Sequence, residues 1–393
     1  MFRIGQEEID AVAQVIHGGQ LFRVNNALHE VEHFEQELAD KFGVKYALCV
    51  SGGTSALTCA LVGMDIGPGD EVIIPAYTFM ATALAVTSVG AIPVLAEIDE
   101  TMTLDLDDVE AKLTPNVKAV IPVDMVGFPC NMLRLKEMSK KYNFKILEDS
   151  CQADGGGYGG KRLGVWGEAG CLSFNDFKIM TAGEGGAVLT NDRHIYERAM
   201  IYHDGGAAFR PNAGEIQEPF FMGTQYRVSE ITGAILRVQL KRLDGILADL
   251  RRTKKAIMTG LADIPGIRFA PSHDPEGDCA TTVAFTFTTA ERARAFAKLV
   301  QNGAWLPIDS GKHVYSNWDP LLAKRGSHHA ALNPFNLPEN KGLRMDYSDT
   351  MCPKTLDILA RTVYISLKAD WTNEHINEVI GQCRQAFQNL DIK

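Results

Sequence analysis

Short apolar runs alternate with helical patterns along the first half of the chain. The runs carry hydrophobic residues at consecutive positions, which is typical of strands buried on both faces of a parallel sheet. This alternation predicts an α/β doubly wound domain. The expected strands cover residues 46–50, 71–75, 92–96, 119–122 and 144–147. The expected helices cover residues 28–42, 55–63, 78–88, 105–112 and 132–142.

The pattern changes after residue 190. Residues 228–261 form one long periodic helix that ends near Pro265 and Gly266. We place a domain boundary there, with a large α/β domain and its N-terminal arm over residues 1–265 and a smaller α+β domain over residues 266–393. The smaller domain is expected to contain strands at 281–287 and 362–367 and helices at 291–301 and 373–389.

Residues 305–350 are irregular and rich in His, Asn, Pro and Tyr. An irregular stretch of this length in a compact enzyme often carries function, so it is the place to look for substrate contacts. The candidates within it are Lys312, His313, Tyr315 and Trp318.

The composition of the chain limits the classes of binding partner and the cellular compartment that we expect. The net charge of −10 argues against a nucleic-acid or anionic-membrane partner, but it leaves room for a local basic pocket that binds an anion. None of the eight cysteines forms a C-x-x-C pair, which indicates free thiols in a reducing compartment and no zinc site. No signal pattern opens the chain and no apolar run reaches the roughly 20 residues of a membrane span, so we expect a cytoplasmic protein.

Two of the expected strands end in groups suited to an anionic, aromatic cofactor. The run Ser51-Gly52-Gly53-Thr54-Ser55 joins a strand to a helix, where free N–H groups and hydroxyls can bind a phosphate. Taken alone, the run is better explained as a tight turn with a Ser or Thr cap. The run lacks the lysine of a nucleotide-binding P-loop. Phe79 follows the next strand and can stack on a ring, or can be an ordinary core aromatic.

Two further positions concern catalysis. Asp149 follows the strand at 144–147, where its carboxylate can hold a pyridinium proton or simply be a solvated acid at a strand end. Lys178 lies among Phe174, Phe177 and other apolar residues. That setting favours a neutral amine able to form a Schiff base, while the alternative is a lysine that snorkels beside a turn. The order of phosphate loop, aromatic, Asp and Lys favours a pyridoxal-5′-phosphate (PLP) enzyme.

The same residues carry a family resemblance. The chain resembles the DegT/DnrJ/EryC1/StrS sugar aminotransferases, which are fold-type-I PLP enzymes with an aspartate-aminotransferase-like fold. The matching stretches are residues 50–57, 67–82, 148–153, 164–192 and 223–240. The resemblance implies a large, mostly parallel-sheet domain, a smaller C-terminal α+β domain and a homodimer with shared active sites.

The resemblance also implies roles for single residues. Lys178 is then the Schiff-base lysine and proton shuttle, and Asp149 binds the pyridine nitrogen. Gln152 lies near the ring hydroxyl and Phe79 covers one face of the ring. The implied phosphate ligands are Gly53, Thr54, Ser55 and Ser173, with Gln225 reaching the site of the neighbouring subunit.

The chain departs from the family pattern at two positions. Asn175 stands where the family usually has His, and Gln225 stands where it usually has Asn. Asn175 is one of the predicted substrate contacts, so the first change affects substrate binding. Gln225 is the predicted contact to the neighbouring subunit, so the second change affects the contacts between subunits. Lys178 itself argues against the 3-dehydratase branch, which has His at that position.

We therefore expect an aminotransferase that moves an amino group from glutamate or glutamine to a keto- or aldehydo-sugar. Residues 274–278, 316–318 and 346–348 resemble the branch that aminates C8 of a 3-deoxy-octulosonate. Two alternatives remain at this point, a PLP-dependent sugar dehydratase or lyase and a non-catalytic sensor protein with the same fold.

Overall fold

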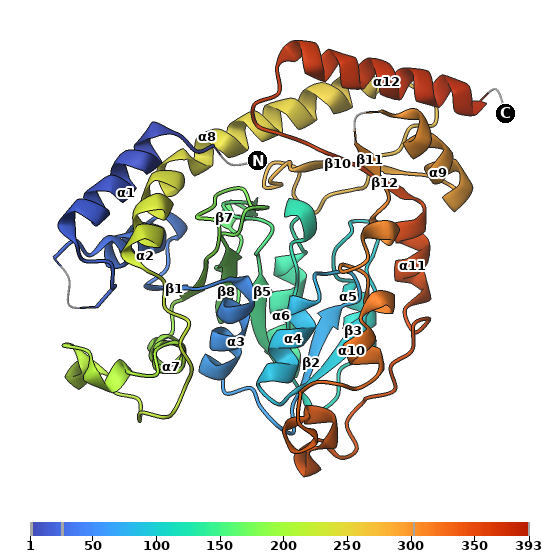
Figure 1. The fold of residues 1–393 in the computed structure, drawn as a ribbon. Helices are drawn as coiled ribbons and strands as arrows, with labels where there is room; N and C mark the ends of the chain where they lie inside the picture. The colour runs from blue at the N-terminus through green and yellow to red at the C-terminus, as the bar shows by residue number, and fades with distance from the viewer. Residues whose placement is uncertain (1–2, 25–26, 302, 392–393) are drawn as a thin grey trace.

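A seven-stranded sheet forms the centre of the molecule (Figure 1). The computed structural model describes residues 3–24, 27–301 and 303–391. In sheet order the strands are β1 (Tyr46–Val50), β9 (Gly186–Thr190), β8 (Ala169–Ser173), β5 (Lys145–Asp149), β4 (Val117–Val120), β2 (Glu71–Pro75) and β3 (Ile92–Ala96). The expected α/β architecture is confirmed.

One strand runs against the others. From β3 to β8 the pairs are parallel, whereas β9 is antiparallel to both β8 and β1. The connection from β8 to β9 contains no helix among its described residues, and a chain without a crossover helix returns most readily as an antiparallel neighbour. The sheet is thus mostly parallel rather than wholly so.

Helices cover both faces of the sheet, which explains why most positions of its strands are apolar. Alternate residues of each strand enter different cores, so that Ile73 of β2 faces one core and its neighbours Val72 and Ile74 face the other. Helices α3 (Gly53–Gly63), α4 (Ala81–Ser88) and α7 (Arg193–His203) pack on one face. On the opposite face lie α2 (Glu30–Phe42), α5 (Leu106–Ala111), α6 (Met132–Tyr142) and the first turns of α8 (Glu230–Leu261).

The polar chain segments that matter for function leave the sheet at one edge. Strands β1, β2, β5 and β8 point the same way, so Ser51, Thr78, Asp149 and Ser173 all lie at or just beyond their carboxyl ends. This is the edge at which open α/β sheets bind ligands.

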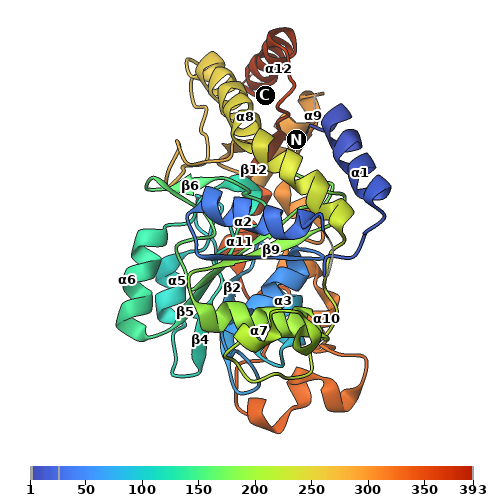
Figure 2. The same cartoon turned by 90° about the vertical axis from the view of Figure 1, so that its left-hand side faces the viewer.

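The C-terminal part builds a second, smaller layer on α8. Its antiparallel sheet has the order β10 (Thr282–Thr286), β12 (Thr362–Ser366), β11 (Ala304–Trp305). Helices α9 (Ala290–Leu299) and α12 (Asn373–Asp391) cover it, and α12 runs alongside the distal half of α8 at the top of both views (Figures 1 and 2). A boundary at residue 265 remains a prediction, because the packing of α12 on α8 continues across it.

After β11, the irregular stretch up to residue 350 contains only short helical turns, the longest being η4 (Pro307–Ser310) and α10 (Asp319–Leu322), with four residues each. It wraps the lower side of the large sheet (Figure 1). The chain then returns through α11 (Pro353–Ala360).

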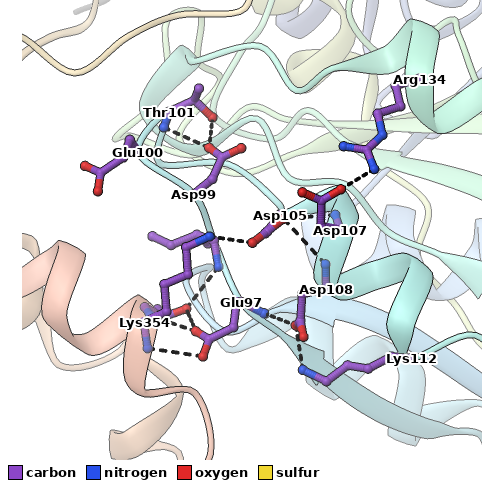
Figure 3. Close-up of polar contacts among 12 residues, drawn as sticks. Glu97, Asp99, Glu100, Thr101, Asp105, Asp107, Asp108, Lys112, Arg134 and Lys354 are labelled. Atoms are coloured by element: carbon purple, nitrogen blue, oxygen red, sulfur yellow. Dashed lines mark hydrogen bonds and ion pairs between the residues drawn. The ribbon is translucent and has the colours of Figure 1, made fainter.

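A set of ion pairs docks α11 on the large domain (Figure 3). The carboxylate of Glu97 accepts hydrogen bonds from the N–H groups of Lys354 and Thr355, at 3.1 and 2.7 Å, and so caps the N-terminus of α11. Lys354 Nζ pairs with Asp105 at 2.6 Å, and Asp105 in turn caps α5. Because the carboxylates of Glu97 and Asp105 are engaged in helix capping and ion pairing, we regard these two acids as structural.

Candidate active site

Two adjoining cavities open at the carboxyl edge of the sheet. The smaller, of about 130 Å³, is lined by residues of the β1–α3 turn, by Asp149 and by Ser173. The larger, of about 410 Å³, extends toward the small domain. Phe79, Gln152, Asn175 and Lys178 line both, so the structure brings these four predicted residues together at one junction.

The β1–α3 turn forms a cradle that only glycine permits. A Cβ atom on Gly53 would lie 2.9 Å from Cys151 Sγ and 3.0 Å from Ser173 Cβ. Gly186 on β9 is equally constrained, since its Cβ would meet the carbonyl of Gly52 at 2.5 Å. The backbone at the start of α3 therefore lies open toward the cavity without a side-chain cap, which suits a phosphate dianion.

Asp149 ends β5 with its carboxylate fixed in direction. The side chain is 5% exposed, Oδ2 accepts a hydrogen bond from Thr82 Oγ1 at 2.8 Å, and Oδ1 accepts one from Cys151 N at 3.3 Å. Asp149 also lines the smaller cavity. Sequence reasoning did not single out Thr82, because a threonine within an apolar helix gives no signal until the fold places it beside the carboxylate.

Lys178 lies on the connection between β8 and β9. Its N–H donates to Asn175 O at 3.1 Å, and Asn175 Oδ1 accepts from Phe177 N at 3.0 Å, so a tight turn presents the lysine. Ile179 is buried and anchors the turn, whereas Phe177 is 73% exposed. The interpretation that both phenylalanines beside Lys178 enclose it is therefore wrong for Phe177, and the half-buried lysine faces the two cavities instead.

A buried carboxyl lies behind this turn. Asp154 is 0% exposed, and neither of its oxygens accepts a hydrogen bond within the described part of the chain. Burial raises the pKa of Asp154 well above its ordinary value, and the positive charge of Lys178 offsets only part of the shift. The backbone N–H groups of Ser173, Ile179 and Met180 also lower this pKa, although none of them meets the geometry of a hydrogen bond to the carboxyl. No pattern in the sequence indicates a buried acid without a hydrogen-bond partner at this position.

This carboxyl leads to a stability prediction. Since the pKa of Asp154 is raised in the folded state, the unfolded chain ionises first, and the folded state loses stability as the pH rises through the unfolded-state pKa toward the folded-state value. Asp154→Asn removes this loss, so the variant should gain about 1–3 kcal/mol of unfolding free energy over wild type at pH 8 and less at pH 5. Thermal unfolding at both pH values tests this, with Asp176→Asn, an exposed acid of the same turn, as control. An equal difference at both pH values would contradict it.

Aromatic and basic side chains form the wall opposite the sheet. The ring of Phe79 lies 5.7 Å from the ring of His313, and Lys312 Nζ lies 5.5 Å from the centroid of Phe79. Burial, with the positive charges of Lys312 and Lys178, lowers the pKa of His313 to about 4, so its imidazole is neutral at pH 7. Gln152 Oε1 accepts from Val126 N at 3.2 Å, which orients the amide at the junction of the cavities.

Four of the predicted residues do not line either cavity. Tyr315 and Trp318 are fully buried, and their polar atoms bond to the backbone at Asp349, Cys352 and Lys312. They support the loop of Lys312 from behind, so their expected role as substrate contacts is corrected. Ser55 Oγ lies 3.0 Å from Ser51 Oγ, below the cradle, and Gln225 is exposed on the surface. Conversely, Trp305 and Lys368 line the larger cavity and were not foreseen.

Comparison with known proteins decides the family. The model of the DegT/DnrJ/EryC1/StrS aminotransferase family matches residues 3–384. The chain belongs to this family. In DegT/DnrJ/EryC1/StrS aminotransferases the cofactor is PLP, and the fold described above is that of PLP-dependent aminotransferases.

Several characterised members of the family resemble this chain. It is 40% identical to GDP-perosamine synthase of Caulobacter vibrioides over 225 residues, which are 56% of this chain and 59% of that enzyme, so less than two thirds of that relative is matched. It is 36% identical to dTDP-3-amino-3,4,6-trideoxy-alpha-D-glucose transaminase of Streptomyces venezuelae, over 67% of this chain and 69% of that one. The crystal structure of 3-amino-5-hydroxybenzoic acid synthase superposes with a TM-score of 0.80 at 27% identity, over 99% of both chains.

The residues of this DegT/DnrJ/EryC1/StrS member fit PLP. The glycine cradle at the start of α3 suits the phosphate, the oriented carboxylate of Asp149 suits a ring nitrogen that carries a proton, and Lys178 lines the same cavity. Within the described residues, no cluster of three or more His, Cys, Asp or Glu side chains is arranged to hold a metal ion. In that same part of the chain, none of the helices is long and apolar enough to span a membrane.

The cradle yields a second prediction. Gly53→Ala places a methyl group against Cys151 and Ser173, and this overpacking costs about 1–3 kcal/mol, so PLP should bind roughly tenfold more weakly or worse. Titration of the apoenzyme with PLP measures the change. Gly245→Ala on α8 meets nothing within 4 Å and should leave the affinity at the wild-type value. Wild-type affinity in Gly53→Ala would show that the phosphate does not occupy the cradle.

Proposed function

We propose that the protein is a PLP-dependent aminotransferase that transfers an amino group from glutamate or glutamine to a keto- or aldehydo-sugar. One observation carries the proposal: Lys178 lies between a cavity that fits the cofactor and a larger cavity that can admit a sugar. The names of similar proteins, which include a perosamine synthase and an amino-sugar transaminase, support the sugar as acceptor.

Each site residue has a place in this proposal. PLP, when bound, supplies an electron sink for the electron pair left when a proton leaves the donor's α-carbon. Lys178 would hold the cofactor through its amine, and the same amine would carry that proton as general base and acid. Asp149, held by Thr82, keeps the proton on the ring nitrogen. Gly53 and Ser173 bind the phosphate.

The remaining contacts complete the pocket. Thr54 adds a hydroxyl and an N–H at the start of α3, Phe79 covers one face of the ring, and Gln152 lies near the ring hydroxyl. Asn175, Lys312 and His313 face the substrate, because they line the larger cavity. We propose as acceptor a nucleotide-linked keto-sugar or an 8-oxo-3-deoxy-octulosonate.

The fate of glutamate separates this function from its two alternatives. Stoichiometric 2-oxoglutarate formation, with the amino group recovered on the sugar, is expected when the PLP-loaded enzyme meets glutamate and a panel of keto-sugars. A dehydratase or lyase that left the amino group off the sugar would contradict the proposal. A protein that bound PLP and turned over neither substrate would be a sensor. The eight free thiols accord with a reducing compartment, and a cytoplasmic location remains a prediction.

We further propose that two copies share their active sites. The segment 223–227 reaches the rim of the cradle, since Ser51 N donates to Tyr226 O at 2.8 Å. Gln225 is nevertheless exposed and lines neither cavity of its own chain. Large apolar side chains beside it are also uncovered, with Met222 99% and Phe209 89% exposed. A second copy would cover these side chains and receive the amide of Gln225.

Arg227 has a structural role instead. Its guanidinium pairs with the buried carboxylate of Asp204, which Arg210 also binds at 2.6 Å. Substituting Arg227 would therefore leave a buried acid partly unpaired, so the test of shared sites uses Gln225 alone.

Mixing two inactive variants tests the shared site. Lys178→Ala lacks the reacting amine, and Gln225→Glu sets a negative charge against the partner's phosphate. After subunit exchange, roughly a quarter of wild-type activity should return, because half the dimers are mixed and each mixed dimer has one intact site of two. No recovery despite proven mixed dimers, or a monomeric protein, would refute shared sites. Lys178→Ala mixed with Lys178→Ala/Gln225→Glu provides the inactive control.

A further inference from the structure

The larger cavity has a charge opposite to that of the whole molecule. Three lysines line it, Lys178, Lys312 and Lys368, and no Asp or Glu does. The chain as a whole carries 49 acidic and 39 basic side chains. A lining of lysines without acids is therefore a local feature, and in a concave site it concentrates positive potential.

The other two lysines of this cavity, Lys312 and Lys368, have no acidic partner among the described residues. Neither Lys312 nor Lys368 forms an ion pair or a side-chain hydrogen bond with any residue that the structure describes, whereas Lys254 pairs with Asp278 at 2.5 Å. Aromatic rings hold Lys312 over the cavity instead, with its Nζ 5.5 Å from the centroids of both Phe79 and Phe177. Aromatic faces fix the position of an ammonium group while leaving its N–H donors free.

The part of the larger cavity that is lined by Trp305, Ser366 and Lys368 is ordered by a separate contact. Trp305 Nε1 donates to Ser366 Oγ at 3.1 Å, which ties the edge strand β11 to the end of β12, two residues before Lys368. Lys312 and Lys368 thus come from segments more than 50 residues apart that the fold brings to one cavity. In the proposed function Lys178 is committed to the cofactor, so only these two lysines remain to meet the substrate beyond its carbonyl.

We propose that Lys312 and Lys368 form an anion-binding subsite that selects an acceptor sugar bearing an oxyanion. The ligand chemistry is a carboxylate of a sugar acid or the diphosphate of a nucleotide-linked sugar. Lysine binds either as a compact point charge with three donors. This inference rests on the proposed function, because it assigns the part of the acceptor that lies away from the reacting carbonyl.

Calorimetry on the PLP-loaded enzyme tests the subsite with three probes. Gluconate carries a carboxylate, GDP carries a diphosphate, and glucose carries neither. We expect gluconate, GDP or both to bind and glucose to bind at least tenfold more weakly. Lys312→Gln and Lys368→Gln should each weaken the anion by roughly tenfold, and binding should weaken as salt is raised. Lys298→Gln, which removes an exposed lysine of α9 outside the cavity, is the matched control.

The results of these measurements distinguish a sugar acid from a nucleotide sugar as the source of the anion. They also test the anion-binding subsite separately from the aminotransferase function. Binding of gluconate alone identifies a sugar acid, binding of GDP alone identifies a nucleotide sugar, and binding of both supports a subsite open to either. The subsite is refuted if neither gluconate nor GDP binds better than glucose. It is also refuted if the double variant Lys312→Gln/Lys368→Gln binds these anions as tightly as wild type does. Formation of 2-oxoglutarate from glutamate, measured on the same wild-type preparation, reports on the aminotransferase function independently of these binding results.

Discussion

Lys178→Ala is expected to leave a folded protein that holds PLP only reversibly and does not transfer amino groups. The amine of Lys178 serves twice in our account, as the group bonded to the cofactor and as the carrier of the proton. Loss of the positioned acid–base group alone lowers rates by roughly 10²–10⁴-fold, and loss of the covalent attachment adds to this. The measurements are single-turnover 2-oxoglutarate formation from glutamate and the visible absorbance of the bound cofactor.

Two controls make the result specific. Lys255→Ala removes an exposed lysine of α8 and should retain wild-type rates. Added methylamine should restore part of the lost rate in Lys178→Ala, since a small amine that enters the cavity can carry the proton. Turnover within a few-fold of wild type in Lys178→Ala would show that another group does this work.

Asp149→Asn is expected to retain PLP and to lose most of the activity, by roughly 10- to 100-fold. A carboxylate stabilises a proton on the ring nitrogen through a charge-assisted hydrogen bond, whereas a neutral amide does not hold the positive charge. The shape of the side chain is almost unchanged, and Thr82 Oγ1, at 2.8 Å, can still donate to an amide oxygen. Comparison of kcat for wild type and variant measures the effect.

A graded control comes from the same contact. Thr82→Val removes the hydroxyl that orients Asp149 but leaves its charge, so its loss should be smaller than that of Asp149→Asn. Wild-type turnover in Asp149→Asn would refute the electronic role of the carboxylate, and an equal loss in both variants would indicate that orientation alone matters.

The strands could be predicted from sequence because burial on both faces leaves an unbroken apolar run. The expected strands at 46–50, 71–75 and 92–96 agree with β1, β2 and β3 at both ends. Strand direction could not be predicted in this way, because the antiparallel strand β9 is as apolar as the parallel strands of the sheet. Helix α1 (Gln6–Gly18) was not expected, since its apolar residues Ile9 and Ile16 are 61% and 57% exposed and mark no buried face.

The residues of the candidate site also fall into those that could be predicted from sequence and those that could not. Asp149 and Lys178 could be singled out because they follow expected strands, and Gly53 because it lies in the run Ser51-Gly52-Gly53-Thr54-Ser55 between a strand and a helix. The close approach of Gly186 to this turn became visible only in the structure. Within 305–350, composition pointed to the loop but could not distinguish Lys312, which faces the cavity, from Tyr315, which is buried behind it. Lys368 and Trp305 join the site only through the pairing of β11 with β12, a long-range contact that local sequence does not encode.

Reduction of the PLP-loaded protein with borohydride, followed by peptide mass mapping, identifies the lysine that is bonded to the cofactor. The larger cavity contains three lysines, so the measurement has to choose among Lys178, Lys312 and Lys368. We predict a pyridoxyl group on Lys178, at about one per chain, and none on the other two lysines. A label on Lys312 or Lys368, or no label on a protein that binds PLP, would contradict it.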